Sequence, residues 1–378
     1  MKNYMRARLF VGVAFLILSI VLIVGYSLND DSMESHTSNI FAMDTTMTLT
    51  AYGENAEKAV SLAQKEIFRL DALLSISGQN SEIAKLNEIS VSYINSSNDS
   101  DSAVNSTDNQ TEISDTLPDA ALNATRSLDV SDDTITLLGR AREVSESTGG
   151  LFDITISQVM DLWGFRSDAH QVPSPDTLAA LVAEIDYTKV QTAGNTVTLP
   201  VDTKVDLGGI AKGFASDRVM EIFREAGVTS GIITLGGNVQ ALGQHPEGRP
   251  WNVAIADPFD PNSTFATIKI EDCAAVTSGG YQRNFTENGV TYHHIIDPRT
   301  GYPADSGIVS VTIVSPDGTL ADGLSTALFI MGLDDASAYW RANSDRFEAV
   351  LVTADGTTYV TGVSQTDLKW QTALRRKS

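Results

Sequence analysis

The chain has 378 residues, of which 42% are hydrophobic and 20% charged, so it can bury a sizeable core and is too apolar to be disordered as a whole. Its formal net charge is −22, from 26 Lys and Arg against 48 Asp and Glu. This excess of acid makes nucleic acid a poor partner, because phosphate contacts need clustered cations. The one cysteine, Cys273, excludes an intrachain disulfide framework and a cysteine-based metal cluster.

The N-terminal segment predicts export. Residues 9–26 carry no charge and follow a basic start with Lys2, Arg6 and Arg8; as a helix they would span roughly 27 Å, close to the thickness of a bilayer core. We expect residues 1–26 to be an uncleaved signal anchor, with the acidic remainder extracytoplasmic and attached to the cell membrane. A cleaved signal peptide is the alternative and would release a secreted protein. The polar residues 27–39 are predicted to form a tether.

The first predicted elements are a strand over residues 41–52 and a helix from Ala56 to Leu74, whose apolar residues recur at helical spacing. A turn and a short helix follow. Residues 90–130 are rich in Ser, Asn, Asp and Thr and are expected to be a disordered insertion. The next helix should begin near Ser131 and end at Gly149, and another should have Pro175 in its first turn.

The C-terminal half alternates strands and helices. Strand-like runs cover residues 251–257, 265–271, 291–297 and 308–315, and residues 350–362 form a hairpin that turns at Asp355-Gly356. One main domain is therefore predicted over residues 40–365, interrupted by the insertion and followed by a tail over residues 366–378.

The first stretch that could form part of a functional site is VDLGGIAKG, residues 205–213. An apolar run ends in Asp206, passes through two glycines and enters a helix. Glycines allow a ligand close to the backbone, and Lys212 can reach an anion at the start of the helix. A tight strand-to-helix turn without function is the alternative.

A second stretch, TLADGLSTALFIMG at residues 319–332, predicts a buried helix. Asp322 and Thr326 are four residues apart and share one face, where a carboxylate and a hydroxyl would suit a hard cation such as Mg²⁺. The alternative is a capping Asp and a Thr bonded to its own helix.

The third and fourth stretches contain histidines and aromatic residues. In a strand, His293 and His294 would point to opposite faces, so one of them could serve a site as a general base. Phe152, Trp163 and Phe165 could flank an aromatic ligand or could simply belong to the core.

Taken in order, these motifs resemble the ApbE family of FAD:protein FMN transferases. The matching segments are Met43-Asp44-Thr45, Ser75 to Asn87, Thr148 to Thr155, Trp163 to Phe165, Asp206 to Gly213, Leu235 to Asn238, Ser278 to Tyr281, His294 to Gly301 and Ala321 to Ala327.

The resemblance implies an α+β fold with mixed or antiparallel sheets and packed helices. It also implies that FAD is the substrate, that Mg²⁺ lies on the FAD pyrophosphate, and that FMN is transferred to a Thr or Ser hydroxyl of an exported acceptor protein. The implied catalytic residues are His294 and Lys212, and the implied metal ligands are Gly209, Asp322 and Thr326. The implied FAD contacts are Met43, Ser77, Phe152, Asp153, Asp206, Lys212 and Ile296.

The sequence departs from the family pattern at two positions: Asp44 replaces a glycine, and Ser77 replaces an aromatic residue found in many relatives. The second departure bears on FAD affinity and on the balance between transfer and hydrolysis. An FAD pyrophosphatase that yields FMN and AMP is therefore one alternative function, and a non-catalytic flavin-binding surface protein is another.

Overall fold

The computed structural model describes residues 33–88, 124–167, 169–362 and 369–370. The predicted signal anchor therefore lies outside the described residues, as does most of the predicted insertion. Within the described part of the chain, no helix is long and apolar enough to cross a membrane.

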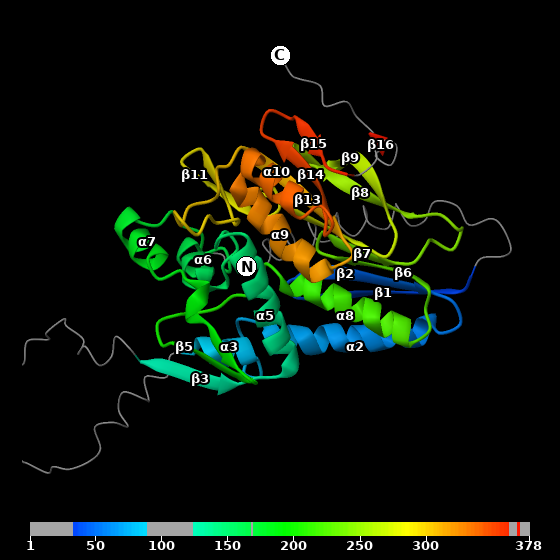
Figure 1. Ribbon diagram of the computed structural model, residues 1–378, viewed down its shortest axis with the longest axis horizontal. Coiled ribbons are helices and arrows are strands. Elements are labelled where there is room, and N and C mark those ends of the chain that lie inside the picture. Colours follow the sequence, from blue (N-terminus) through cyan, green and yellow to red (C-terminus); the bar gives the residue numbers. More distant parts are fainter. Residues whose placement is uncertain (1–32, 89–123, 168, 363–368, 371–378) are drawn as a thin grey trace, which may run out of the picture.

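An eight-stranded antiparallel sheet forms the centre of the fold (Figure 1). Its strands, in spatial order, are β1 (Ser35–Ala42), β2 (Thr45–Tyr52), β6 (Ser230–Leu235), β7 (Asn238–Leu242), β10 (Ala274–Gly279), β13 (Ile308–Ser315), β14 (Glu348–Thr353) and β15 (Thr358–Val360). The hairpin predicted at Asp355-Gly356 is confirmed as the connection between β14 and β15.

Helices cover one face of this sheet. The long helices are α2 (Ala56–Leu74), α8 (Ala211–Glu225) and α9 (Gly318–Met331), and α5 (Asp132–Ser147) and α10 (Leu333–Ala342) pack beside α9. The apolar faces of these helices and of the sheet share one large cluster that includes Leu49, Ile67, Phe223 and Leu328. Burial of this continuous apolar surface is the main force that holds the two layers together.

A smaller sheet covers the opposite face. It consists of β8 (Trp251–Asp257), β9 (Asp260–Ile270) and β16 (Lys369–Trp370). The apolar residues of β8 and β9 pack against Ala241, Ala275 and Val350 of the central sheet. The fold therefore combines helices with antiparallel sheets, as the sequence predicts.

The remaining elements lie towards one end of the molecule (Figure 1). They are α3 (Glu82–Asn87), β3 (Thr125–Asp129), η1 (Ile154–Ile156), α6 (Ser157–Trp163), α7 (Pro175–Val182), η2 (Tyr187–Lys189), β4 (Gln191–Ala193), β5 (Thr196–Pro200), β11 (Asn284–Glu287) and β12 (Val290–His293). Ser131 caps α5 and Ser174 caps α7, the latter with Pro175 in its first turn, so both predicted helix starts are confirmed.

Several predicted boundaries are wrong. The strand expected over residues 41–52 is a hairpin, because Met43 and Asp44 both adopt left-handed backbone angles, with φ of 48° and 60°. Its first strand, β1, uses residues 35–39 of the predicted tether. Similarly, β3 uses residues 125–129 of the predicted insertion and pairs with β5, and residues 369–370 of the predicted tail pair with β9.

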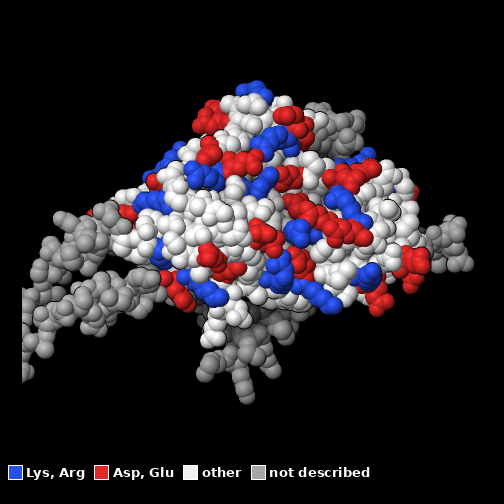
Figure 2. Space-filling model, turned by 60° about the horizontal axis from the view of Figure 1, so that its bottom comes forward, with Lys and Arg blue, Asp and Glu red and all other residues white. Residues whose placement is uncertain are grey.

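Charged side chains of both signs are interspersed on the surface. Figure 2 shows Lys and Arg among Asp and Glu on one face of the molecule. Many of these groups form ion pairs, as Arg69 does with Glu66 and Asp133 and as Arg346 does with Glu143.

Candidate active site

The DLGGIAKG segment forms a tight turn that leads into α8. Asp206 N–H donates to the Ile154 carbonyl at 2.7 Å, and the Asp206 Oδ1 accepts a hydrogen bond from Gly208 N–H at 2.7 Å. Lys212, one turn later, donates from Nζ to the Gly208 carbonyl at 3.1 Å. These contacts place a carboxylate and an ammonium group at the two sides of a glycine turn.

Helices α8 and α9 approach closely at Gly213. Its N–H donates to Asp322 Oδ2 at 2.8 Å, and a Cβ atom at position 213 would lie only 2.2 Å from the Gly318 carbonyl oxygen. Only glycine fits here, because any side chain would force the helices apart. The close approach brings the buried Asp322 carboxylate to within 3.9 Å of Lys212 Nζ through its Oδ1.

The three predicted metal ligands offer oxygen donors only. Asp322 and Thr326 lie one turn apart on α9, and the Phe152 ring lies against the backbone of Gly209, where a Cβ atom would be 3.0 Å from Cε2. No group of three His, Cys, Asp or Glu side chains with metal-binding geometry occurs in the described residues. A carboxylate, a hydroxyl and a backbone carbonyl are nevertheless the hard donors that Mg²⁺ accepts, with water and substrate phosphate completing its shell. The donor set therefore fits magnesium.

His294 follows directly after β12, so the strand predicted over residues 291–297 ends earlier than expected, at His293. The Arg283 carbonyl lies 3.1 Å from His294 Nδ1 and accepts a further bond of 3.1 Å from the His294 backbone N–H. A carbonyl can only accept, so Nδ1 must carry the proton, which leaves the lone pair on Nε2. Burial, with the nearby charge of Arg283, lowers the pKa of His294 to about 3. The ring is therefore neutral and available as a base at neutral pH.

His293 has a different environment. Its Nδ1 accepts from the Ile295 N–H at 3.3 Å, its Nε2 lies 3.2 Å from the Ala304 carbonyl, and its ring meets Phe329 edge to face. Both ring nitrogens are thus hydrogen-bonded to backbone groups. Burial lowers the pKa of His293 as well. This side chain packs the fold and has no free nitrogen for chemistry.

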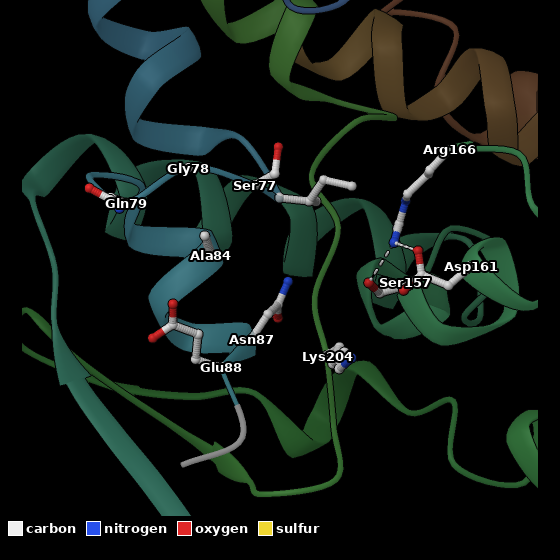
Figure 3. A pocket seen from close by; sticks show the side chains of 11 residues that line it. Ser77, Gly78, Gln79, Ala84, Asn87, Glu88, Ser157, Asp161, Arg166 and Lys204 are labelled. Atoms are coloured by element: carbon white, nitrogen blue, oxygen red, sulfur yellow. Dashed lines mark hydrogen bonds and ion pairs between the residues drawn. The ribbon is translucent and has the colours of Figure 1, made fainter. Parts of the chain in front are cut away.

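A cavity of about 430 Å³ opens between the segment that begins at Ser77 and the side chains of Asp161 and Arg166 (Figure 3). Ser77 lines it at one end, and Arg166 and Lys204 line it from the other side. Arg166 bonds to Asp161 and Ser157 and forms an ion pair with the Asp206 carboxylate, so it joins the cavity to the glycine turn. The sequence-based prediction missed Arg166, although it directly follows the Trp163 to Phe165 motif.

The aromatic residues of that motif belong to the core. Trp163 is fully buried, stacks on Phe165, and donates from Nε1 to the Gly301 carbonyl at 2.8 Å. Ile296 is buried in the same small cluster, and its backbone forms an isolated bridge with Pro303. The aromatic pair therefore does not line the site, and Ile296 can offer mainly its backbone to a ligand.

Both carboxylate oxygens of Asp153 accept hydrogen bonds from within the protein. Its Oδ1 accepts bonds from the Thr155 N–H and hydroxyl, and its Oδ2 accepts from the Tyr187 N–H at 2.9 Å. Burial raises the pKa of this carboxyl even though these bonds lower it. The contacts fix the loop that presents Phe152 to Gly209.

Met43 and Asp44 form the hairpin turn between β1 and β2. Asp44 Oδ2 accepts from Arg283 Nη2 at 3.1 Å, so the residue that replaces glycine is tied to the segment that holds His294. The turn between β6 and β7 closes against the same hairpin, because a Cβ atom on Gly236 would lie 2.4 Å from the Thr45 hydroxyl. The motifs at Met43, Leu235 and His294 thus converge, although they are far apart in the chain.

The family model for ApbE matches residues 43–351. The chain belongs to the ApbE family. A curated relative from Treponema pallidum, named FAD:protein FMN transferase, is 37% identical over 222 residues, which cover 54% of this chain and 61% of that relative. A relative of the same name from Vibrio cholerae is 35% identical, with coverages of 60% and 69%.

Solved structures agree with the fold. The ApbE protein of Thermotoga maritima has a TM-score of 0.74 at 27% identity, and the match covers 88% of this chain and 99% of that one. The flavin transferase ApbE of Vibrio cholerae has a TM-score of 0.71 at 25% identity, with coverages of 89% and 99%. The antiparallel sheet and its helices are therefore an ApbE fold.

Proposed function

We propose that this chain is an FAD:protein FMN transferase that depends on Mg²⁺ and acts on a Thr or Ser hydroxyl of an acceptor protein. The observation that carries the proposal is the meeting of α8 and α9, which sets a buried carboxylate, Asp322, beside the ammonium of Lys212. The named relatives support the activity, and the oxygen donors of Asp322, Thr326 and Gly209 support the metal.

Different residues would bind different parts of FAD. Arg166 and Asp206 stand where the cavity meets the glycine turn, so the cavity lined by Ser77 would receive an aromatic end of FAD. Lys212 would pair with a non-bridging oxygen of the pyrophosphate, where charge increases in the transition state. A Mg²⁺ ion held by Asp322, Thr326 and the Gly209 carbonyl would neutralise further charge on these oxygens.

His294 would remove the proton from the acceptor. The acceptor hydroxyl oxygen forms a bond to the phosphorus of the FMN half, its proton passes to Nε2 of His294, and the bond to the bridging oxygen breaks to release AMP. A base with a pKa near 3 is weak. However, the cationic Arg283 and Lys212 contribute to this low value, and the anionic pyrophosphate would oppose them and raise the pKa when FAD binds.

Hydrolysis is the competing outcome of the same site. Ser77 provides no aromatic surface at the cavity, so the flavin or adenine would be held less firmly than by an aromatic side chain. Water in place of the acceptor hydroxyl would then give FMN and AMP.

Incubation of the protein with FAD, Mg²⁺ and a co-expressed acceptor, followed by mass spectrometry, tests the proposal. Covalent FMN on a Thr or Ser of the acceptor is the expected result. FMN and AMP without a modified acceptor would make the protein a pyrophosphatase, and intact FAD after binding would make it a flavin-binding protein.

The placement of the protein in the cell is also a proposal. We infer that residues 1–26 anchor it and that the domain over residues 40–365 is extracytoplasmic, where exported flavoproteins would be its acceptors. The support is the uncharged run at residues 9–26 behind a basic start.

A further inference from the structure

Helix α9 carries two of the proposed metal ligands, and a carboxylate from α8 holds its N-terminus. Asp217 Oδ1 accepts bonds of 2.9 Å from the Gly318 N–H and from Gln240 Nε2. Asp217 Oδ2 accepts from the Thr319 N–H at 2.8 Å and from the Thr319 hydroxyl at 2.6 Å. One side chain thus pairs with four donors, three of which belong to the first turn of α9.

A second contact between the same helices lies one turn away. Gly213 is four residues before Asp217 on α8, and Asp322 is four residues after Gly318 on α9. The Gly213 N–H bonds to Asp322 Oδ2 at 2.8 Å, and Asp217 bonds to the Gly318 N–H. The two helices are therefore fixed at two points, and a slide of α9 along α8 would break both.

We propose that Asp217 is a positioning residue for the metal ligands of α9. It sets the register of α9 on α8 and so holds the Asp322 carboxylate and the Thr326 hydroxyl opposite the glycine turn. The proposal rests on the proposed function, since it assumes that these two side chains bind Mg²⁺. Without Asp217, the contact at Gly213 alone would leave the first turn of α9 free to shift.

A simple stabilising role is the competing explanation, and the chain offers a matched control for it. Asp317 is the N-cap of α9 itself: its Oδ1 accepts from the Leu320 N–H at 2.8 Å, and its Oδ2 pairs with Arg140. Asp317→Ala removes a carboxylate from the same helix end but leaves every contact between α8 and α9 in place. A positioning role predicts that the two variants differ in metal affinity even where they lose similar stability.

The experiment compares the full-length wild type with Asp217→Ala, Asp217→Asn and Asp317→Ala. Mn²⁺ binding is titrated by electron paramagnetic resonance, urea unfolding gives stability, and FAD cleavage is measured against Mg²⁺ concentration. Second-layer groups of metal sites typically change affinity by about 10–100-fold. We therefore expect Asp217→Ala to raise the Kd for Mn²⁺ and the half-saturating Mg²⁺ concentration at least tenfold, with kcat at saturating Mg²⁺ within about threefold of wild type. Asp317→Ala should change the Kd less than twofold.

Asp217→Asn keeps an acceptor oxygen for Gly318 and loses the one for Thr319, so its Kd should be intermediate. If Asp217→Ala does not fold, the Kd of Asp217→Asn for Mn²⁺ is compared with those of wild type and Asp317→Ala instead. An unchanged Mn²⁺ affinity in the Asp217 variants, or an equal loss in Asp317→Ala, would overturn the positioning role alone. Equal Mn²⁺ affinity of wild type and Asp322→Ala would overturn the metal assignment and this proposal together.

Discussion

Replacement of Gly213 by alanine tests the contact between α8 and α9 on which the site depends. The added Cβ would lie 2.2 Å from the Gly318 carbonyl oxygen and 2.7 Å from Asp322 Cβ. Since non-bonded heavy atoms prefer a separation of about 3.5 Å, the helices would have to part by roughly 1 Å. Such a shift would break the 2.8 Å bond between the Gly213 N–H and Asp322 Oδ2.

The expected cost has two parts. Overpacking of a close contact costs about 1–3 kcal/mol, and loss of a hydrogen bond to a charged group costs about 1.5–3 kcal/mol. These parts overlap, because the same movement relieves the first and causes the second. We therefore expect Gly213→Ala to lower the free energy of unfolding by about 3 kcal/mol and to displace the Asp322 carboxylate from Lys212.

Urea unfolding and FAD cleavage measure the two effects. Gly139→Ala is the control, because Gly139 lies in α5 and an added Cβ would meet no atom within 4 Å apart from the backbone of its own helix and its chain neighbours. This variant should raise stability by about 0.5–1 kcal/mol and leave turnover unchanged. Wild-type stability and wild-type turnover in Gly213→Ala would refute the close contact and the role assigned to it.

Four further predictions follow from the site. Asp322→Ala should abolish FAD turnover and leave the fold intact by circular dichroism; activity that persists in EDTA would contradict the metal assignment. His294→Ala should slow FMN transfer by about 10²–10⁴-fold, whereas His293→Ala should mainly lower the melting temperature; an equal loss of rate in both would disprove the assignment of the base. Because the native pKa of His294 is lowered to about 3 and the unfolded value is about 6.5, the unfolded state binds the extra proton between these pH values. The contribution of His294 to stability should therefore be full above pH 6.5 and be lost as the pH falls towards 3, by at most about 1.4 kcal/mol per pH unit, and urea titrations of His294→Gln should show a flatter profile. Deletion of residues 92–120, which spares β3, should leave FAD cleavage within about twofold, since we expect this polar segment to connect surface elements; a deletion that prevents folding would show that it packs.

Local patterns in the sequence predicted the elements whose signals lie within a few residues. The serine caps at Ser131 and Ser174, the helix from Ala56 to Leu74 and the turn at Asp355-Gly356 are examples. Each depends on side-chain spacing or on a backbone preference that acts between neighbours. The order of the short motifs also identified the family, because each motif fits one turn or helix of the fold.

Boundaries were missed where pairing between distant strands decided them. Residues 35–39 and 125–129 are mostly polar and are predicted from the sequence to belong to a tether and to a disordered insertion, yet each completes the edge of a sheet through hydrogen bonds to a partner strand. Backbone bonds of this kind need no apolar pattern in the edge strand. The strand predicted through residue 297 ends at His293, which pairs with Asn284, the first residue of its antiparallel partner β11.

The sequence by itself determined that Asp322 and Thr326 share a helix face and that Lys212 follows a glycine turn, because four-residue spacing and glycine geometry are local properties. Only the tertiary structure decided that Asp322 meets Gly213, that Asp217 holds the start of α9, that Arg166 pairs with Asp206, and that the proton of His294 is on Nδ1. Each of these joins residues that are far apart in the chain, from 11 positions for His294 and Arg283 to 109 for Gly213 and Asp322. Such contacts form because burial of the shared apolar core packs α8, α9 and the sheet together, and the spacing of residues along one element does not specify which partner it will meet.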